Sequence, residues 1–275
     1  MASTSNRLMY IGIAITAIFV LMAVCAPFLP MLGMLADPNE FLSNPIHHPP
    51  SWQYWFGTDQ QGHDVFARTI ASAGVAWQVV LASTAISLVI GVPLGMISGY
   101  RGGWLDRLLV FVMDAVYTLP GLLLSITIAF VVGAGVWNAA IALSIAYIPQ
   151  YFRVIRNQTV SVKTELFIEA AEALGASNWD VIVRYLAQNV IQSIPVIFTL
   201  NAADAILTLA GLGFLGLGVP EDVPEWGHDL KQALDSLSTG ENIWWTTVFP
   251  GLAITLMVVG LSLLGEGLTQ KESQT

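Results

Sequence analysis

The chain has 275 residues, of which 55% are apolar and 11% are charged, and its formal net charge is −9 at pH 7. Soluble domains carry about a quarter charged residues, and a chain this apolar would expose large apolar patches to water. The composition therefore excludes an ordinary soluble protein, gives no indication of a nucleic acid partner, and indicates a protein surrounded by membrane lipids.

Charge-free apolar runs predict where the chain crosses the bilayer. A helix needs about 20 apolar residues to cross the hydrocarbon, because each residue rises about 1.5 Å. The third run is long enough for two helices with a turn at residues 133–135, and Asp204 is the only charge in the fourth. We therefore predict an all-α membrane protein with six transmembrane helices. In chain order the runs are residues 8–36, 70–100, 115–152, 189–218 and 243–265.

The first run also has features of a secretory signal, because Arg7 precedes the apolar stretch of residues 8–24. The apolar run continues past Pro27 and Pro30, which is longer than a signal needs and favours a retained helix. Cys25 is the only cysteine, so it has no disulfide partner within the chain and says little about the redox compartment.

Positive charges predict the orientation, because Lys and Arg favour the cytoplasmic side of a membrane protein. With six spans both termini share a side, and placing them in the cytoplasm puts eight of the ten basic residues there. Only Arg68 and Lys231 remain outside. Most acidic residues then fall in the outer segments, a face suited to a partner with basic rims or simply to solubility.

Two parts are predicted along the chain. Residues 1–70 form an N-terminal transmembrane helix and a proline-rich external loop, in which Thr58 and Asp59 are expected to cap a surface helix over residues 61–69. Residues 71–275 form a five-helix core. Its two longer excursions are a cytoplasmic loop at residues 153–184 and an external segment at residues 219–242.

A stripe of small residues lies on the second predicted span, at Gly91, Gly95 and Gly99. Small residues at this spacing let two helix backbones approach closely within a membrane. We therefore expect this span to pack tightly against a neighbouring helix.

The cytoplasmic loop has the pattern of a short amphipathic helix over residues 161–176. Gly175 is placed to end this helix, since glycine tolerates the left-handed conformation that closes one, and Asn178 is placed to cap the next. Two short helices between two spans are a poor shape for a catalytic pocket and suit a surface presented to a partner. The apolar positions at helical spacing are Leu166, Ala170, Ala173 and Leu174.

The segment Glu169, Ala170, Ala171, followed after three residues by Gly175, resembles the EAA loop of binding-protein-dependent importer permeases. In that family the loop is a coupling helix that sits in a groove of a cytoplasmic ATPase. The resemblance implies that this chain is moved by such a partner. The implied ATPase-coupling residues are Glu169, Ala170, Ala171, Leu174 and Gly175.

Three further stretches resemble the second, C-type permease subunit of the oligopeptide/dipeptide/nickel branch of ABC importers. The resemblance implies a type I ABC importer permease architecture in a bacterial inner membrane. The chain would form half of a translocation path for peptides, which family frequency favours, or for nickel or another small solute. The stretches are residues 56–65, residues 214–218 with 224–227, and residues 244–245 with 249–252.

The same resemblance implies four kinds of partner or contact. These are a homologous second permease, two cytoplasmic ATPase subunits, an extracytoplasmic substrate-binding protein and membrane lipids. Glu225, Trp226 and Gly227 are expected to help dock the binding protein, although Trp226, Trp244 and Trp245 also suit simple anchoring at the membrane interface. Whether the two permeases are identical or different remains open at this stage.

The chain departs from the family pattern at several positions. Family members usually have arginine where His63 stands, and Leu-Pro where this chain has Ala187 and Gln188. Without that proline, the helix after the cytoplasmic loop is expected to run on unkinked. Many relatives also carry an acidic residue near Leu209, where this chain has Asp204 as the nearest.

No phosphate-binding G-x-x-x-x-G-K-[ST] loop occurs, so ATP is expected to be used by partner subunits and no cofactor to be bound by this chain. No catalytic residues are identified. His47, His48, His63 and Asp64 lack helical metal-ligand spacing, so no metal site is expected either.

Asp204 falls within a predicted span, and Asp114 directly precedes the third charge-free run, in a helix expected to begin about two turns earlier. A charged aspartate near mid-membrane costs about 2.5–3.5 kcal/mol, so Asp204 should face a cavity or be protonated. It is either a translocation-path residue that meets a cationic group of the substrate or a structural hydrogen-bond partner of a neighbouring helix. Asp114 is expected to pair with Arg107 of its own helix.

Two other functions compete with the importer permease. A self-contained secondary transporter or channel would need its own coupling ions, and the scarcity of charges within the spans disfavours it. An intramembrane enzyme such as a protease would need paired aspartates at matched depth, whereas Asp114 and Asp204 are expected at different depths.

Overall fold

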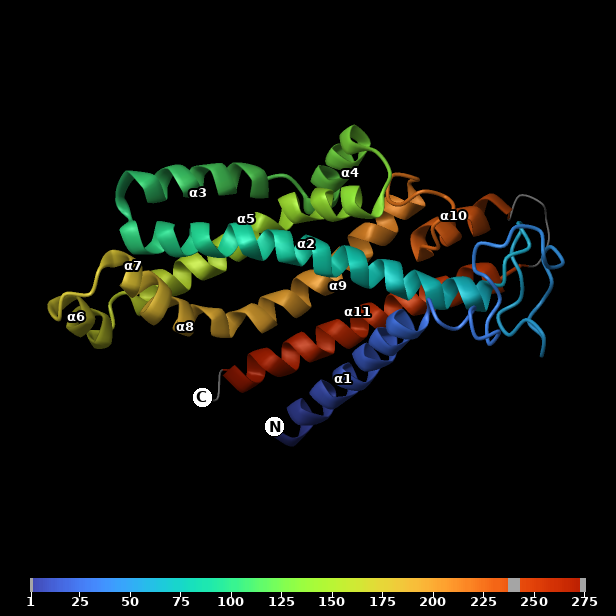
Figure 1. Ribbon diagram of the computed structural model, residues 1–275, viewed down its shortest axis with the longest axis horizontal. Helices are drawn as coiled ribbons and strands as arrows, with labels where there is room; N and C mark the ends of the chain where they lie inside the picture. Colours follow the sequence, from blue (N-terminus) through green and yellow to red (C-terminus); the bar gives the residue numbers. More distant parts are fainter. Residues whose placement is uncertain (1, 237–242, 273–275) are drawn as a thin grey trace.

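A computed structural model describes residues 2–236 and 243–272, and all regular elements in these ranges are helices apart from one antiparallel β-bridge between Thr58 and Asp64. Helices α2 and α5 run close to the long axis of the molecule, and α1 and α11 lie together at an angle to it (Figure 1). The helices are α1 (Ala2–Cys25), α2 (Val65–Arg101), α3 (Gly103–Tyr117), α4 (Gly121–Val132), α5 (Val136–Val162), α6 (Leu166–Ala173), α7 (Asn178–Asp180), α8 (Ala187–Val190), α9 (Ile194–Phe214), α10 (Trp226–Ser236) and α11 (Trp245–Glu272).

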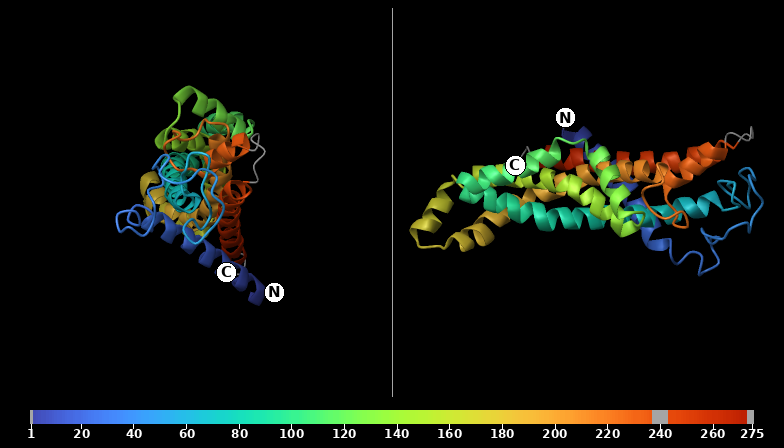
Figure 2. Two further views of the ribbon diagram at one scale, coloured as in Figure 1. Left: turned by 90° about the vertical axis from the view of Figure 1, so that its right-hand side faces the viewer. Right: turned by 90° about the horizontal axis from the view of Figure 1, so that it is seen from above.

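The molecule is elongated, with two different ends. The short helices α6 and α7 form one end, and the coil between α1 and α2 forms the other (Figures 1 and 2). The start of α1 and the end of α11 lie near each other, because these two helices pack side by side. The predicted cytoplasmic loop and the predicted first external loop therefore lie at opposite ends of the helix bundle.

The core is built on close packing of α2 against α5. A Cβ atom on Gly91, Gly95 or Gly99 would lie 2.9, 2.8 or 2.8 Å from an atom of α5, which confirms the predicted small-residue stripe. Glycine is required here because any side chain would force the two backbones apart. The largest cluster of buried apolar residues then joins α2 and α5 to α9 and α11.

Four helical segments are long and apolar enough to cross a membrane, within the residues described: Arg7–Cys25, Val65–Arg101, Asn178–Phe214 and Trp245–Gln270. The pair α3 and α4 adds a fifth if it is one broken span. Helix α5 has 27 residues, but its basic residues Arg153 and Arg156 lower its hydropathy, so composition alone does not mark it as a sixth.

The span predicted before the turn at residues 133–135 is not one continuous helix, because the chain bends by 85° between α3, which ends at Tyr117, and α4, which begins at Gly121. The bend lies at Pro120, whose ring removes a backbone donor and disfavours a helical conformation at Leu119. The predicted turn at residues 133–135 is confirmed, with φ values of +87° at Gly133 and +156° at Gly135.

The start of α2 also differs from the prediction. No separate surface helix covers residues 61–69; the long helix α2 begins at Val65, and Asp64 caps it by accepting from the backbone N–H of Phe66 at 2.9 Å. Asp59 instead stabilises the preceding turn, where it accepts from the backbone of Gln61 and His63. The division at residue 70 falls within α2.

Candidate functional site

The predicted cytoplasmic loop folds as a short helix followed by a sharp turn. Helix α6 covers only Leu166–Ala173 of the expected residues 161–176. At its start, α5 continues to Val162 and a short turn separates the two helices. Gly175 ends the helix with φ +89°, as predicted, and its N–H donates to the carbonyl of Glu172. Ser177, and not Asn178, caps the next helix by accepting from the backbone of Asp180 at 3.2 Å.

Most of the predicted coupling residues lie on the outer surface of this loop. Glu169, Ala170, Leu174 and Gly175 are exposed, and Leu174 is 89% exposed. Ala171 is only 5% exposed and packs toward the chain itself. The apolar stripe expected on α6 therefore faces outward, where another protein can cover it, whereas Ala171 holds the helix in place.

The inner face of α6 is anchored to the end of α2. Ile168 is 1% exposed and lies in a cluster with Tyr100. The hydroxyl of Tyr100 donates to Glu172 Oε1 at 2.9 Å and lies 3.1 Å from Asn178 Oδ1. The ammonium group of Lys163 donates to the carbonyl of Tyr100 and lies over its ring. Tyr100 was not singled out from the sequence, because its partners lie more than 60 positions away.

The helix that follows the loop runs without a break from Asn178 to Phe214. This agrees with the expectation drawn from Ala187 and Gln188, but the helix is not regular. It contains a π-helical stretch, Val181–Leu186, and a 3₁₀ turn, Ile191–Ser193. The π-helical stretch overlaps the end of the predicted cytoplasmic loop, and both irregularities precede α9, a position where such segments often mark a hinge.

Asp204 lies on α9, and its environment combines both of the alternatives that the sequence left open. The hydroxyl of Tyr147 on α5 donates to Asp204 Oδ2 at 2.8 Å, which is a hydrogen bond to a neighbouring helix. Asp204 is also exposed, although the residues on either side of it are buried. It lines a cavity of about 380 Å³ together with Gln150, Thr208 and residues 116–122 at the bend between α3 and α4.

The predicted pairing of Asp114 with Arg107 is wrong. Arg107 donates to the carbonyl of Gly103 on its own helix, whereas Arg153 on α5 pairs with Asp114 at 2.7 Å. Two turns of helix separate Arg107 from Asp114, about 10 Å along the axis, while α5 passes directly beside α3. The Arg153 and Asp114 side chains are 39% and 48% exposed, and the guanidinium lies 4.0 Å from the centroid of the Tyr117 ring.

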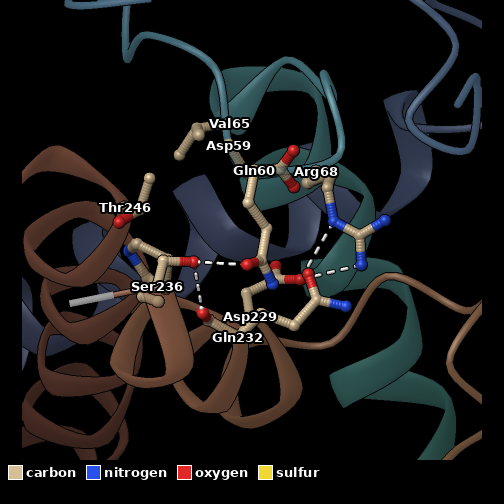
Figure 3. A pocket seen from close by; sticks show the side chains of 10 residues that line it. Asp59, Gln60, Val65, Arg68, Asp229, Gln232, Ser236 and Thr246 are labelled. Carbon is tan, nitrogen blue, oxygen red and sulfur yellow. Dashed lines mark hydrogen bonds and ion pairs between the residues drawn. The ribbon is translucent and has the colours of Figure 1, made fainter. Parts of the chain in front are cut away.

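A buried ion pair joins α2 to α10, which lies in the predicted external segment. Arg68 donates to Asp229 Oδ1 from Nε at 2.9 Å and from Nη2 at 2.7 Å, and the two side chains are 3% and 11% exposed. Figure 3 shows this pair beside a void of about 20 Å³, with Gln60 accepting a hydrogen bond from Ser236 at its other side. The pairing neutralises one of the two basic residues predicted to lie outside.

The three residues predicted to dock a binding protein are internal. Glu225 and Trp226 are 2% and 1% exposed, and a Cβ on Gly227 would overlap the backbone of Ala210. The Trp226 indole donates to the carbonyl of Thr69 at 3.0 Å. The structure therefore gives these three residues a structural role and corrects the expectation that they form a docking surface, because side chains enclosed by their own chain cannot touch a partner.

Glu225 caps helix α10 from within this enclosed position. Its carboxylate accepts from the backbone N–H groups of Gly227 and His228, each at 2.9 Å. Burial raises the pKa of Glu225 to about 7, because removing water disfavours the charged form more than the two N–H groups favour it. The predicted external segment thus contains a carboxyl group whose pKa is raised by burial toward neutral pH.

The histidines of the external loop take part in internal contacts. His63 is buried and its Nδ1 lies 2.9 Å from Asp59 Oδ2. Burial alone would raise the pKa of Asp59, but its hydrogen bonds with His63 and the backbone outweigh that effect and lower it. Within residues 2–236 and 243–272, no group of three or more His, Cys, Asp or Glu side chains is arranged to hold a metal ion.

Comparison with known proteins identifies the family to which this chain belongs. A family model described as the inner membrane component of binding-protein-dependent transport systems matches residues 91–271. The chain belongs to this family. The match covers the stripe of glycines on α2, the predicted coupling residues 169–175, Asp204 and the predicted external segment at residues 219–242, and starts after the first predicted external loop.

Relatives of this transport family extend the match to nearly the whole chain. The dipeptide transport system permease protein DppC of Alkalihalophilus pseudofirmus is 38% identical over 263 residues, covering 96% of this chain and 84% of that protein. The glutathione transport system permease protein GsiD of Pectobacterium atrosepticum is 33% identical over 252 residues, covering 91% of this chain and 83% of that protein.

The fold is similar to that of a solved member of the ABC transporter class. An inward-facing conformation of the MetNI methionine ABC transporter aligns with a TM-score of 0.59 at 17% identity, covering 74% of this chain and 95% of that one. This identity supports the fold alone. Membership in the transport family makes the chain an inner-membrane permease subunit of an ABC importer, which works with an ATPase, a binding protein and a second permease.

Proposed function

We propose that this permease forms half of the translocation path of an importer for short peptides. Its relatives are named for the transport of dipeptides and of glutathione, which is itself a tripeptide, and this supports peptides over nickel. The complex would contain a second, homologous permease, two cytoplasmic ATPase subunits that bind and hydrolyse ATP, and one extracytoplasmic binding protein.

The proposed topology has six spans with both termini in the cytoplasm. Helix α5 supplies the sixth span, because its 27 residues reach about 40 Å at 1.5 Å per residue, and its basic residues lie toward the α6 end. Residues 1–70 then form the first span and external loop, and residues 71–275 form the five-helix core. The positive charge of the cytoplasmic side supports this orientation.

The proposal that an ATPase binds to the coupling loop (residues 166–175) rests on the exposed face of this loop. Leu166 and Leu174 are 80% and 89% exposed and lie at the two ends of α6. The inner face of this helix packs against the chain through Ile168, which is 1% exposed. Apolar side chains in such a position gain free energy when a partner covers them. Glu169 lies on the same loop and is exposed, so it can meet a basic group at the rim of the ATPase.

The binding protein is proposed to dock on the opposite end, but not through residues 225–227. Exposed groups there include Trp52, which is 97% exposed, and the acidic pair Glu221 and Asp222. An acidic rim with an exposed aromatic side chain suits a partner surface that carries basic groups.

Purification of the assembled importer tests this function. Leu174→Glu changes a side chain that touches little of its own chain, so the permease should still insert, whereas co-purification of the ATPase and ATP-driven dipeptide uptake should be lost. Trp52→Glu is the matched control, since it places the same charge at the opposite end and should retain the ATPase. A wild-type chain that moves solute without any ATPase would refute the proposal.

A further inference from the structure

The cavity beside the bend between α3 and α4 has the features of a substrate site. Irregular backbone inside a membrane is tolerated only where it is buried in protein or lines a water-accessible cavity. Here the residues of the bend, including Thr118 and Pro120, line a cavity of about 380 Å³. Polar side chains from α5 and α9 face them across this space: Tyr147, Gln150, Asp204 and Thr208.

Asp204 lacks a charge partner in the part of the chain that the structure describes. Tyr147 donates to one carboxylate oxygen, while the other oxygen makes no hydrogen bond with any described residue, and no Lys or Arg there pairs with it. A carboxylate within an apolar helix costs about 2.5–3.5 kcal/mol. The hydrogen bond from the Tyr147 hydroxyl offsets only part of this free-energy cost. A positive charge on another molecule would offset the rest.

A basic residue lies farther along α5, beyond Gln150. Tyr147, Gln150 and Arg153 follow one another at intervals of three residues, so each is a neighbour of the next on the helix surface, and Arg153 is turned by about 120° from Tyr147 around the helix axis. Arg153 lies over the ring of Tyr117, which itself lines the cavity. The Arg153 pair with Asp114 is half-exposed, so a carboxylate from outside can reach the guanidinium and replace Asp114.

The rise along α5 between the two groups is comparable with the length of a short peptide. Six residues of helix separate Tyr147, which holds Asp204, from Arg153, and their backbones are about 9 Å apart along the helix axis at 1.5 Å per residue. Two or three extended peptide residues span up to about 7–10 Å. Gln150 lies between the two charges and offers an amide to the backbone of such a peptide.

We infer that this cavity binds a short zwitterionic peptide, with its ammonium group at Asp204 and its carboxylate at Arg153. The inference rests on the proposed function and narrows it to peptides with both termini free. Tyr147 acts as a positioning residue, because its hydroxyl fixes the orientation of the Asp204 carboxylate.

Uptake by the complete importer in proteoliposomes tests the two ends separately. The substrates are di-alanine, its N-acetyl form and its C-terminal amide, each at a concentration that saturates the binding protein. Asp204→Asn should lower uptake of di-alanine about tenfold, the factor expected when a charge-assisted hydrogen bond is lost, and leave the N-acetyl form unchanged. Arg153→Gln should also lower uptake of di-alanine about tenfold, but it should leave uptake of the C-terminal amide unchanged.

Controls distinguish charge recognition from damage to the protein. Asp204→Glu should restore most of the uptake, and the exposed charges altered in Glu266→Gln and Arg107→Gln should change uptake by less than about twofold, in line with surface substitutions. Equal loss for all three substrates in Asp204→Asn, with ATP hydrolysis still stimulated by the loaded binding protein, would overturn the inference and leave the proposed function intact. Absence of that stimulation in the wild type would refute the proposed function instead.

If the binding protein rejects the modified peptides, a labelling experiment tests binding of unmodified di-alanine in the cavity. A single cysteine in place of Leu119, which is exposed at the cavity, is introduced together with Cys25→Ser. Di-alanine should slow its reaction with a maleimide when Asp204 is present, and not in the Asp204→Asn background. Labelling that is indifferent to di-alanine in both backgrounds would overturn the inference.

Discussion

Replacing Tyr100 by phenylalanine tests whether the coupling loop moves as one body with α2. The ring of Tyr100 is buried in the cluster that contains Ile168, and its hydroxyl reaches Glu172 at 2.9 Å. Phenylalanine keeps the packing of the ring and removes only the hydroxyl. The substitution therefore loosens one attachment between the loop and the helix bundle without creating a cavity.

The magnitude follows from the one hydrogen bond that this hydroxyl donates, to Glu172. A hydrogen bond to a charged group contributes about 1.5–3 kcal/mol. Glu172 and Asn178 are both exposed, so water can replace the hydroxyl in part, and we expect a loss of about 1–2 kcal/mol. This shifts the balance between attached and detached loop by a factor of about 5–30.

The assay is the number of peptides imported per ATP hydrolysed by the reconstituted complex. Tyr100→Phe should lower this ratio about fivefold or more, while the ATPase still co-purifies and still hydrolyses ATP. Tyr10→Phe is the matched control, because Tyr10 is exposed on α1, far along the chain from the loop. An unchanged ratio in Tyr100→Phe, or the same loss in Tyr10→Phe, would refute the idea that this hydroxyl transmits the movement.

Two further predictions concern the outer segment. Asp229→Asn leaves the Arg68 guanidinium buried without its charge partner and should lower the free energy of unfolding in detergent by about 3–5 kcal/mol, whereas the exposed Asp222→Asn should have little effect. Glu225 has a pKa near 7 in the folded protein against 4.5 in its unperturbed state, so the folded state binds the extra proton and stability should fall as the pH rises from about 4.5 to about 7. Thermal unfolding at pH 5 and pH 8 measures this, and Glu225→Gln should lack that part of the pH dependence; an identical pH dependence in the variant would contradict the assignment.

The sequence alone determined the features that depend on local composition and conformation. Long apolar runs predicted the helical membrane fold, because the bilayer demands internally hydrogen-bonded segments of a minimum length. The glycine stripe on α2 and the end of α6 at Gly175 were also predictable, since each depends on a property of glycine itself. The EAA pattern pointed to the family that the comparisons then showed.

Only the tertiary structure decided which side chains meet and which face they present. Asp114 pairs with Arg153 of α5 and not with Arg107 of its own helix. Trp226 is buried within the chain and is not available to another protein. Tyr100 reaches Glu172 across 72 positions of sequence. Such contacts depend on how the helices pack, and hydrophobic periodicity carries no information about which charge on a neighbouring helix lies within 3 Å of another.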